Sequence, residues 1–561
     1  MIKIVVEDQG KKYECAAGSS LMDTLHAHGM RVDAPCGGSG RCGKCRVRVV
    51  SGELPVTAED QRFLSERERK DGVRLACTAR PTSDLRIRLL SKPAGRMAAV
   101  TDVTGPEEIG RASGASMRRN AQEHGENGYG IAVDIGTTTL AACLYGLPDG
   151  VVCETVTDVN SGRDFGADVL SRMEASCGGK RARLQELLQE DVRALLGRLL
   201  ERTAVQTSDV KKLVIAANMT MVHLLMGYSC EMLGRAPFVP VNKRMIRADA
   251  MRILGDGSLP SPVIILPAVS AFVGGDIVSG MLSLGLDRGS ETVLFLDIGT
   301  NGEMALRYNG QIYVTSAAAG PAFEGGGISC GCASVQGAIC GVRLVEKGQS
   351  EGSAEKRTLL FTPEPRTCCG AAGKHDSLAL RTIGDAVPVG ICGSGVLELV
   401  SELLRVGILD ASGLLAEQYR ERGFLLGETV SGEPIVFTQG DVRALQLAKG
   451  AIRAGIEALL AAAGVHASEV AHIYLAGGFG VRMDETAAIG IGLLPEEFRG
   501  RIQAIGNSSL SGAVFAGGCA QLDAACEALL AQCRQVTLAD QPEFEENYVR
   551  YMNFPDGFLP I

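Results

Sequence analysis

The alternation of apolar and polar residues near the N-terminus predicts short strands. Residues 2–7, 46–50 and 85–90 alternate as half-buried strands do, and residues 20–29 show the spacing of a helix. A glycine-rich loop separates this helix from the second strand. The pattern therefore predicts a small α+β unit over residues 1–91.

Residues 92–128 lose this periodicity and collect Gly, Ser, Pro, Arg and Glu. Such a composition is typical of a flexible linker. Beyond it, buried-looking strands alternate with helical patterns such as 181–202 and 441–463, as in α/β proteins with a central sheet. The chain is thus expected to have two working parts joined by a hinge.

The α/β region contains an internal repeat. Ile131 to Thr138 and Leu294 to Asn301 each consist of an apolar strand that runs into Asp-Ile-Gly-Thr, and the two segments lie 163 positions apart. Repetition of one strand and turn at this distance suggests two structurally related half-domains.

Charge and hydropathy narrow the classes of partner. The chain has 56 Lys and Arg against 65 Asp and Glu, a net charge of −9, which argues against nucleic acid or an anionic membrane as the main partner. The longest uncharged apolar stretch, 257–275, contains three prolines and is too broken for a membrane-spanning helix. The N-terminus lacks the layout of a secretory signal, so a cytoplasmic location is expected.

Eighteen cysteines in a reducing compartment are better explained as metal ligands, buried thiols or reactive thiols than as disulfides. Cys36, Cys42 and Cys45 follow the spacing C-x5-C-x2-C, and Cys77 lies 32 positions further on. Four soft thiolates in a glycine-rich loop suit a [2Fe-2S] cluster, because the glycines let backbone N–H groups approach the sulfurs. The glycines of this loop are Gly37, Gly38, Gly40 and Gly43.

Other interpretations of this loop are weaker. A structural zinc site usually has two C-x-x-C pairs, and here there is one. The loop also nearly fits a Walker A motif, but Cys45 occupies the position of the Mg²⁺-binding Ser or Thr. The first 91 residues resemble a [2Fe-2S] ferredoxin domain of the β-grasp kind. The roles of five other cysteines stay open: Cys330, Cys332, Cys340, Cys368 and Cys369.

Each Asp-Ile-Gly-Thr turn places a carboxylate, N–H groups and a hydroxyl at the end of a strand, a combination that suits Mg²⁺ and phosphate. The two turns resemble the phosphate loops of the superfamily of acetate and sugar kinases, Hsp70 and actin. The apolar strand that ends in Gly477 and Gly478 resembles its adenosine motif. A single such turn is often only a loop, but three in this order favour an ATP site. The resemblance implies Asp134, Gly136, Thr137 and Thr138 in the first phosphate loop and Asp297, Gly299, Thr300 and Asn301 in the second.

The whole chain resembles the reductive activators of corrinoid proteins, which pair a ferredoxin domain with such an ATPase. Further segments that carry this resemblance are 163–172, 319–325, 391–395, 446–449 and 506–508. The resemblance implies a multidomain α+β and α/β protein. Its expected parts are a β-grasp ferredoxin domain at 1–91, a linker at 92–128, a smaller actin/Hsp70-like ATPase half-domain at 129–205 and a larger one at 206–561.

The function implied is ATP-dependent return of an oxidised Co(II) corrinoid to Co(I) in a methyltransferase system. The cofactors would be a [2Fe-2S] cluster and ATP with Mg²⁺, and the electron would come from a cellular reductase or ferredoxin. Asp134 and Asp297 would position Mg²⁺, Glu324 would orient the attacking water, and Gly477 and Gly478 would face the adenosine. The turn that contains Ser394 either completes the nucleotide site or lies against the corrinoid partner, unless Ser394 only caps a helix.

Three other functions compete with this one. An ATP-coupled activator of a different low-potential acceptor would share the ATPase part, and a small-molecule kinase could carry the ferredoxin as a redox sensor. A chaperone-like module is the weakest alternative, because no peptide-binding β-domain pattern follows the ATPase part. The corrinoid partner, the methyl donor, the electron donor and the oligomeric state, including a homodimer, are left open.

Overall fold

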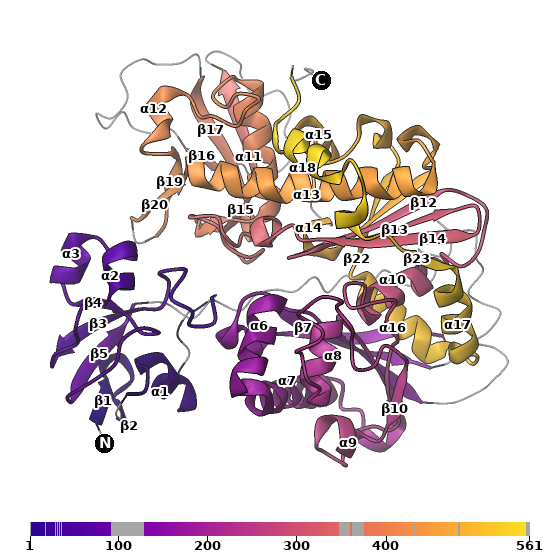
Figure 1. The fold of residues 1–561 in the computed structure, drawn as a ribbon, viewed down its shortest axis with the longest axis horizontal. Coiled ribbons are helices and arrows are strands. Elements are labelled where there is room, and N and C mark those ends of the chain that lie inside the picture. Colours follow the sequence, from indigo (N-terminus) through magenta and orange to yellow (C-terminus); the bar gives the residue numbers. More distant parts are fainter. Residues whose placement is uncertain are drawn as a thin grey trace.

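The computed structural model describes residues 2–90, 128–346, 359–361 and 375–556, apart from residues 17, 29, 31, 33, 35, 148, 431, 481 and 482. The linker predicted at 92–128, except its last residue, and two of the cysteines with open roles, Cys368 and Cys369, lie outside the described residues. Figure 1 shows an N-terminal domain in indigo beside two larger bodies, magenta below and orange to yellow above. In the described residues we find no helix with the length and apolar character that crossing a membrane requires.

The N-terminal domain is a five-stranded sheet with helices packed on it, as the alternating pattern predicts. The strand order is β2-β1-β5-β3-β4, with β1 parallel to β5 and the other neighbours antiparallel. Its elements are β1 (Ile2–Val6), β2 (Lys11–Cys15), α1 (Leu21–Ala27), β3 (Arg46–Ser51), α2 (Ala58–Phe63), α3 (Glu66–Lys70), β4 (Val73–Leu75) and β5 (Leu85–Leu89).

The first half of the α/β region, which follows this domain, forms a six-stranded sheet in the order β10-β11-β9-β6-β7-β8. This sheet continues well past residue 205, so the domain boundary predicted there falls between α7 and β9, inside the same sheet. Its elements are β6 (Tyr129–Ile135), β7 (Thr139–Gly146), β8 (Val152–Val159), α6 (Val169–Ala175), α7 (Arg181–Thr203), β9 (Val210–Ala217), α8 (Met219–Met226), β10 (Ile246–Ala248), α9 (Ala250–Leu254) and β11 (Val263–Ile265).

The second half repeats this plan in a sheet of order β22-β21-β12-β13-β14-β23. In both sheets, an antiparallel meander of three strands is extended by parallel strands on the side of its first strand. The repeat of Asp-Ile-Gly-Thr therefore reflects a repeat of the fold. The sheet strands are β12 (Val293–Ile298), β13 (Gly302–Tyr308), β14 (Gln311–Ala317), β21 (His472–Ala476), β22 (Ile502–Gly506) and β23 (Cys533–Gln535).

The second half is larger because it carries an additional four-stranded sheet, β16-β17-β15-β18, and the hairpin β19-β20. Long helices, α11 and α13 among them, pack with these elements in one core. The elements are β15 (Ala338–Glu346), β16 (Leu359–Phe361), β17 (His375–Thr382), β18 (Gly390–Ile391), α11 (Gly393–Arg405), α12 (Glu417–Arg420), β19 (Phe424–Glu428), β20 (Pro434–Phe437), α13 (Gln439–Ala463), α14 (Gly477–Gly480), α15 (Glu485–Gly490) and α18 (Phe544–Met552).

Two helices fill the space between the six-stranded sheets: α10 (Gly275–Leu284) and α16 (Ser508–Gly518), with α17 (Leu522–Gln532) beside them (Figure 1). One apolar core holds Val214 of the first sheet, Phe295 of the second and Leu510 of α16. The two helices touch through their backbones, since a Cβ atom at Gly512 would lie 1.9 Å from the carbonyl oxygen of Ser279. The two halves are thus joined by a tightly packed helix pair.

The chain end is anchored to α13 by a buried lysine. Lys449 has no exposed surface, and its Nζ donates to the carbonyl of Tyr551 and, at 2.7 Å, to that of Asn553. The same Nζ lies 5.1 Å from the ring centroid of Phe554. Burial lowers the pKa of Lys449 to about 7, yet both the charged and the neutral amine can donate to these carbonyls. Lys449 therefore fastens the residues that follow α18.

We expect Lys449→Met to reduce the free energy of unfolding by about 1–3 kcal/mol, because two hydrogen bonds to the carbonyls of Tyr551 and Asn553 are lost while the apolar stem is kept. Urea unfolding would give the size of the loss, and hydrogen exchange should rise first in α18. Lys211→Met is the control, since Lys211 is exposed and donates only to a nearby surface carbonyl. Equal stability of the two variants would contradict the anchoring role.

Candidate functional site

The four predicted cluster cysteines come together in the N-terminal domain as two pairs. The Sγ atoms of Cys36 and Cys42 are 3.3 Å apart, and those of Cys45 and Cys77 are also 3.3 Å apart. Cys45 and Cys77 are buried, whereas Cys36 and Cys42 are half-buried. Among the described residues no three Cys, His, Asp or Glu side chains converge on a single ion site. Two thiol pairs fit a two-iron cluster, with one pair for each iron.

Backbone N–H groups surround these sulfurs, as the glycine-rich loop predicts. The Cys42 thiol, followed by the N–H groups of Arg41 and Gly38, lowers the pKa of Cys36 to about 4. In the other pair, the Cys45 thiol and the N–H of Gly40 lower the pKa of Cys77. Each pair therefore already favours one thiolate, the form that binds iron. The loop residues fit the chemistry of a [2Fe-2S] cluster.

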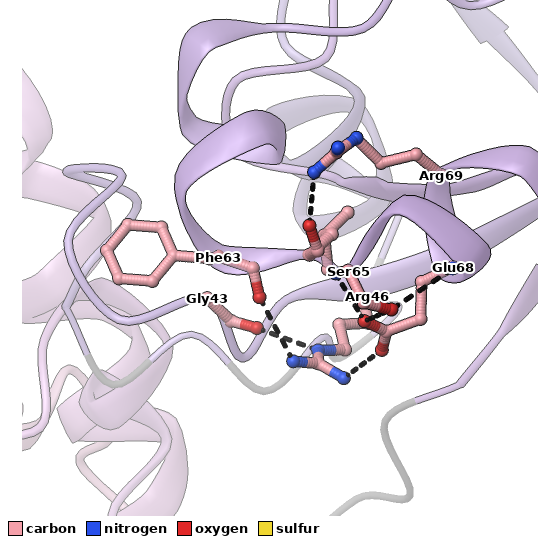
Figure 2. A network of polar contacts seen from close by, with 7 residues as sticks. Gly43, Arg46, Phe63, Ser65, Glu68 and Arg69 are labelled. Carbon is pink, nitrogen blue, oxygen red and sulfur yellow. Dashed lines mark hydrogen bonds and ion pairs between the residues drawn. The ribbon is translucent and has the colours of Figure 1, made fainter.

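Arg46 fixes the cluster loop from behind, a role that the sequence pattern did not reveal. Figure 2 shows its guanidinium between the loop and the two short helices. Nε donates to the carbonyl of Gly43 at 3.0 Å, Nη2 to that of Phe63 at 3.5 Å, and Nη1 to the Glu68 carboxylate at 2.5 Å. Gly43 has φ +66°, and a Cβ there would lie 2.8 Å from Phe63. The segment between Cys42 and Cys45 is therefore held in one conformation.

The two phosphate loops each follow the first strand of their own sheet. Asp134 lies in β6 and Asp297 in β12, one residue before each strand ends. Both turns close by the same kind of backbone bond: the N–H of Gly136 donates to the carbonyl of Thr139, and that of Gly299 donates to the carbonyl of Asn301. The turns expected from the repeated motif are thus present.

Glu324 connects the two phosphate loops. It ends a 3₁₀ turn, Pro321–Glu324, and accepts a hydrogen bond of 2.8 Å from the Thr300 hydroxyl of the second loop. The hydroxyl of Thr138 in the first loop bonds to it as well. Glu324 therefore contacts both loops, and its role with an attacking water stays a prediction.

Three polar side chains hold the first phosphate loop from outside. Asn160 Nδ2 donates to the Gly136 carbonyl at 2.8 Å, and Asn218 Nδ2 donates to Thr137 Oγ1 at 3.1 Å. Arg172 Nη2 donates to the Thr137 carbonyl at 2.5 Å. These three contacts hold the first phosphate loop in one conformation from behind.

Two further carboxylates, Asp276 and Glu303, belong to this site but were missed in the sequence. After burial, the charge of Asp276 raises the pKa of Asp297, and the charges of Asp276 and Asp297 raise the pKa of Glu303. Asp134 is held differently, since it accepts from Asn507 Nδ2 at 2.9 Å and Ser509 Oγ at 2.8 Å. Its two donors lie at the start of α16, so this carboxylate bridges the two halves of the molecule.

Burial raises the pKa of each carboxyl group in this cluster. For Asp297 burial comes first, followed by the charges of Asp276, Asp134 and Glu324, and its pKa rises to about 7. Burial, with the charge of Asp134, also raises the pKa of Asp276 to about 7. Like charges crowded in this way attract a divalent cation, which Mg²⁺ can satisfy through one or two carboxylates together with water and phosphate. The arrangement fits a Mg²⁺-nucleotide site.

We expect the nucleotide-free protein to lose stability as the pH rises from about 4 to about 7. The folded state binds the protons of Asp276 and Asp297 more tightly than the unfolded chain does, so their contribution is complete below the unfolded pKa and is lost as these groups ionise. Melting temperatures should therefore fall across this window, and Mg²⁺ with a non-hydrolysable ATP analogue should raise them more at alkaline than at acid pH. Asp276→Asn should flatten the profile. An equal ligand effect at both ends would contradict this.

The adenosine motif meets the second phosphate loop. β21 pairs parallel with β12 and runs straight into α14 at Gly477, whose φ is +87°. A Cβ at Gly477 would lie 3.0 Å from Asp297 Oδ1, so only a glycine fits beside this carboxylate. Gly478 follows and is exposed. Both glycines therefore lie at the turn where β21 meets the second phosphate loop.

Ser394 does not cap a helix, contrary to one of its three predicted roles. α11 begins at Gly393, and the residue at its N-cap is Cys392. Ser394 lies within the first turn, buried, with its Oγ 3.3 Å from the Cys392 Sγ. A Cβ at Gly393 would lie 1.8 Å from the Phe323 carbonyl, so this turn packs directly behind Glu324. Ser394 is therefore connected to the nucleotide site by the contact of its turn with Phe323.

Together these features define an ATPase-fold protein with an N-terminal iron-sulfur domain, and comparisons with known families agree. Residues 4–82 match the 2Fe-2S iron-sulfur cluster binding domain. Residues 129–289 match the RACo middle region, and residues 291–559 match the C-terminal domain of RACo, the ASKHA domain. The cofactor of the first domain is a [2Fe-2S] cluster, and ATP with Mg²⁺ fits the last.

The chain belongs to the family of reductive activators of corrinoid proteins. It is 30% identical over 456 residues to the corrinoid activation enzyme RamQ of Eubacterium limosum, a match that covers 77% of this chain and 71% of RamQ. It is 28% identical over 400 residues to the [Co(II) methylated amine-specific corrinoid protein] reductase of Methanosarcina barkeri, covering 68% of each chain. The solved structure of a reductive activator for corrinoid, iron-sulfur protein matches with a TM-score of 0.65 and 26% identity, over 99% of this chain and 98% of that one.

Proposed function

We propose that this protein reduces the Co(II) form of a corrinoid protein to Co(I) at the expense of ATP. Membership of the activator family supports this proposal. The observation that carries it is the combination, in one chain, of two cysteine pairs with two phosphate loops that Glu324 connects. The first is an electron-transfer site and the second a nucleotide site.

The protein's own residues would act as follows in the iron-sulfur domain. Cys36, Cys42, Cys45 and Cys77 would hold a [2Fe-2S] cluster, which supplies one-electron chemistry near −400 mV in proteins of the plant type. Arg46 keeps the loop in place, and the N–H groups along it would stabilise the thiolates. A reduction at lower potential than this requires coupling to another source of free energy, which ATP would supply.

In the ATPase domain, Asp134 and Asp297 would position Mg²⁺ directly or through water. Gly136, Thr137 and Thr138 on one side and Gly299, Thr300 and Asn301 on the other would bind the phosphates. Gly477 and Gly478 would face the adenosine, and Ser394 would support the turn behind Glu324. The raised pKa of Glu324 suits a carboxylate that orients the attacking water and accepts its proton. ATP hydrolysis is the step by which this domain would drive the reduction.

The partners follow from this proposal. The electron acceptor would be a corrinoid protein of a methyltransferase system, and the donor a cellular reductase or ferredoxin. The domain division that we propose keeps 1–91 as the ferredoxin domain and 92–128 as the linker. The ATPase boundary then moves from residue 205 to about residue 290, where the two matched regions meet.

The test is anaerobic mixing of the reduced protein with a Co(II) corrinoid protein, followed by visible spectroscopy for the Co(I) band. The Co(I) band should appear with Mg-ATP and should be absent without nucleotide or with a non-hydrolysable analogue. No Co(I) despite a reduced cluster and measurable ATP hydrolysis would favour another acceptor. A phosphorylated small molecule as the product would instead favour a kinase.

A further inference from the structure

The N-terminal domain docks on the ATPase fold with its cluster loop. A Cβ atom at Gly37, next to Cys36, would lie 2.2 Å from the carbonyl oxygen of Phe165, so the two backbones are in direct contact. At the edge of this contact, Lys180 Nζ is 3.2 Å from Asp23 Oδ1. The segment Arg163–Gly166, which carries Phe165 and follows β8, thus forms a docking segment for the ferredoxin domain.

An aromatic contact adds to this docking surface. The ring of His26, in α1, lies 6.0 Å from the ring of Phe165 at an interplanar angle of 55°. His26 is half-buried, and burial is the main reason that its pKa is lowered. The backbone contact and the ring contact both use Phe165, whereas the ion pair uses Lys180, which directly precedes α7.

The docking segment is tied to the first phosphate loop by one side chain. Arg172, in α6, has no exposed surface. Its Nε donates to the Gly166 carbonyl at 2.8 Å, and its Nη2 donates to the Thr137 carbonyl at 2.5 Å. A planar guanidinium fixes the two carbonyls relative to each other, because its donors point in set directions. The guanidinium of Arg172 therefore joins Gly166 of the docking segment to Thr137 of the first phosphate loop.

We propose that Arg172 couples docking of the ferredoxin domain to nucleotide occupancy of the first phosphate loop, so that the docked domain and the bound nucleotide stabilise each other. This inference rests on the nucleotide site of the proposed function. A phosphate that orders the Gly136–Thr138 turn also orders the Thr137 carbonyl, Arg172 and the docking segment, so the ordering cost is met once for both events. Such coupling is reciprocal: docking raises the affinity for the nucleotide by the same factor by which the nucleotide raises the docking constant.

The arrangement has a consequence for electron delivery. While the domain is docked, the Gly37 side of the cluster loop lies against Phe165, and a large acceptor protein cannot approach it there. Loss of the nucleotide after hydrolysis would weaken docking and expose this side. The coupling would thereby link the state of the nucleotide to the access of the corrinoid partner.

The test is the affinity of the full-length holoprotein for Mg²⁺ with a non-hydrolysable ATP analogue, measured by calorimetry. Asp23→Lys and Lys180→Asp each put like charges at the docking contact and should weaken binding about fivefold, the low end of coupling between linked sites. The double variant should restore the affinity. Lys70→Glu, in an exposed ion pair of the same domain with Glu66, is the matched control and should change nothing. Unchanged affinity in both single charge reversals would overturn the proposal.

Arg172→Met tests the connection itself. In this background the charge reversals should no longer change the affinity for the analogue, since the link between the two carbonyls is gone. Because a buried arginine can be needed for folding, Phe165→Ala serves as the second variant and should weaken binding as Asp23→Lys does, with α6 intact. A charge effect that persists without the guanidinium would overturn the role of Arg172.

Hydrogen exchange separates the failure of this inference from that of the proposed function. Amides of residues 163–166 should be protected in the wild type, more so with the analogue, and less in Asp23→Lys. If the analogue binds with full affinity but protection never changes, the coupling is absent and the ATP site stands. If no analogue binds to any variant, both the coupling and the ATP site are overturned.

Discussion

Cys42→Ser is expected to remove the [2Fe-2S] cluster and all corrinoid reduction. Cys42 Sγ lies 3.3 Å from the Sγ of Cys36, so the substitution leaves one of the two pairs with a single thiol. A serine hydroxyl is a harder and far less acidic ligand than a thiol, and changes in the surroundings of metal ligands alone already cost about 10–100-fold in affinity or activity. Cluster absorbance and iron content should therefore fall at least about tenfold.

The control for this prediction is Cys153→Ser. Cys153 is an exposed cysteine of the first ATPase half, in β8 and remote in the fold from the two pairs, and its replacement should leave the visible spectrum unchanged. Binding of an ATP analogue should persist in Cys42→Ser, reduced at most by the factor that docking contributes. A normal cluster spectrum in Cys42→Ser would remove Cys42 from the ligand set.

Local spacing explains why the cluster site could be predicted from the sequence. Three of the four cysteines lie within ten positions, and the glycines between them leave the loop few other uses. The strands around the loop also follow from alternation, and the predicted bounds differ from β1, β3 and β5 by one residue. Arg46 could not be predicted in this way, since its three acceptors lie in a loop, a helix end and a second helix.

The repeat of Asp-Ile-Gly-Thr predicted the duplicated fold because the motif marks the same strand end in both sheets. The division at residue 205 did not follow the sheet, because the helix α7 separates a meander from parallel strands that return to it. In the sequence, the end of a long helix resembles a domain boundary. The pairing of β9 with β6 depends instead on burial of both faces of the strand. Such pairing over a long separation has no local signal.

Two residues at the nucleotide site, Asn507 and Arg172, lie in segments that carry the family resemblance, but their roles depend on tertiary packing and were not predicted. Asn507 reaches Asp134 from a position 373 residues away, and Arg172 has the polarity of a surface helix residue although it has no exposed surface. Glu303 lies two residues beyond the predicted turn, so the motif itself could have extended to it. A buried charge of this kind is recognised only when its partners are in place.

Asp297→Asn is expected to lower the rate of ATP hydrolysis at least about a hundredfold, the size of effect seen when one electrostatic contact to a transition state is lost. Burial, followed by the charges of Asp276, Asp134 and Glu324, raises the pKa of Asp297. Asparagine keeps the shape beside Gly477 but removes the charge that would hold Mg²⁺. Single-turnover hydrolysis with excess enzyme would measure the loss, and the cluster spectrum should be unchanged.

The same substitution should stabilise the nucleotide-free protein at pH 8, which separates lost activity from lost folding. The folded pKa of Asp297 is about 7, so at pH 8 the wild type has a charged group that burial disfavours, and asparagine does not. Its melting temperature should therefore rise without ligand and respond less to Mg²⁺. Asp540→Asn is the control, because Asp540 is exposed and ends the turn Leu538–Asp540 beyond β23, so it should alter neither property. Full hydrolysis by Asp297→Asn would show that the second Asp-Ile-Gly-Thr turn is structural, and the Mg²⁺ role would then fall to Asp134 and Asp276.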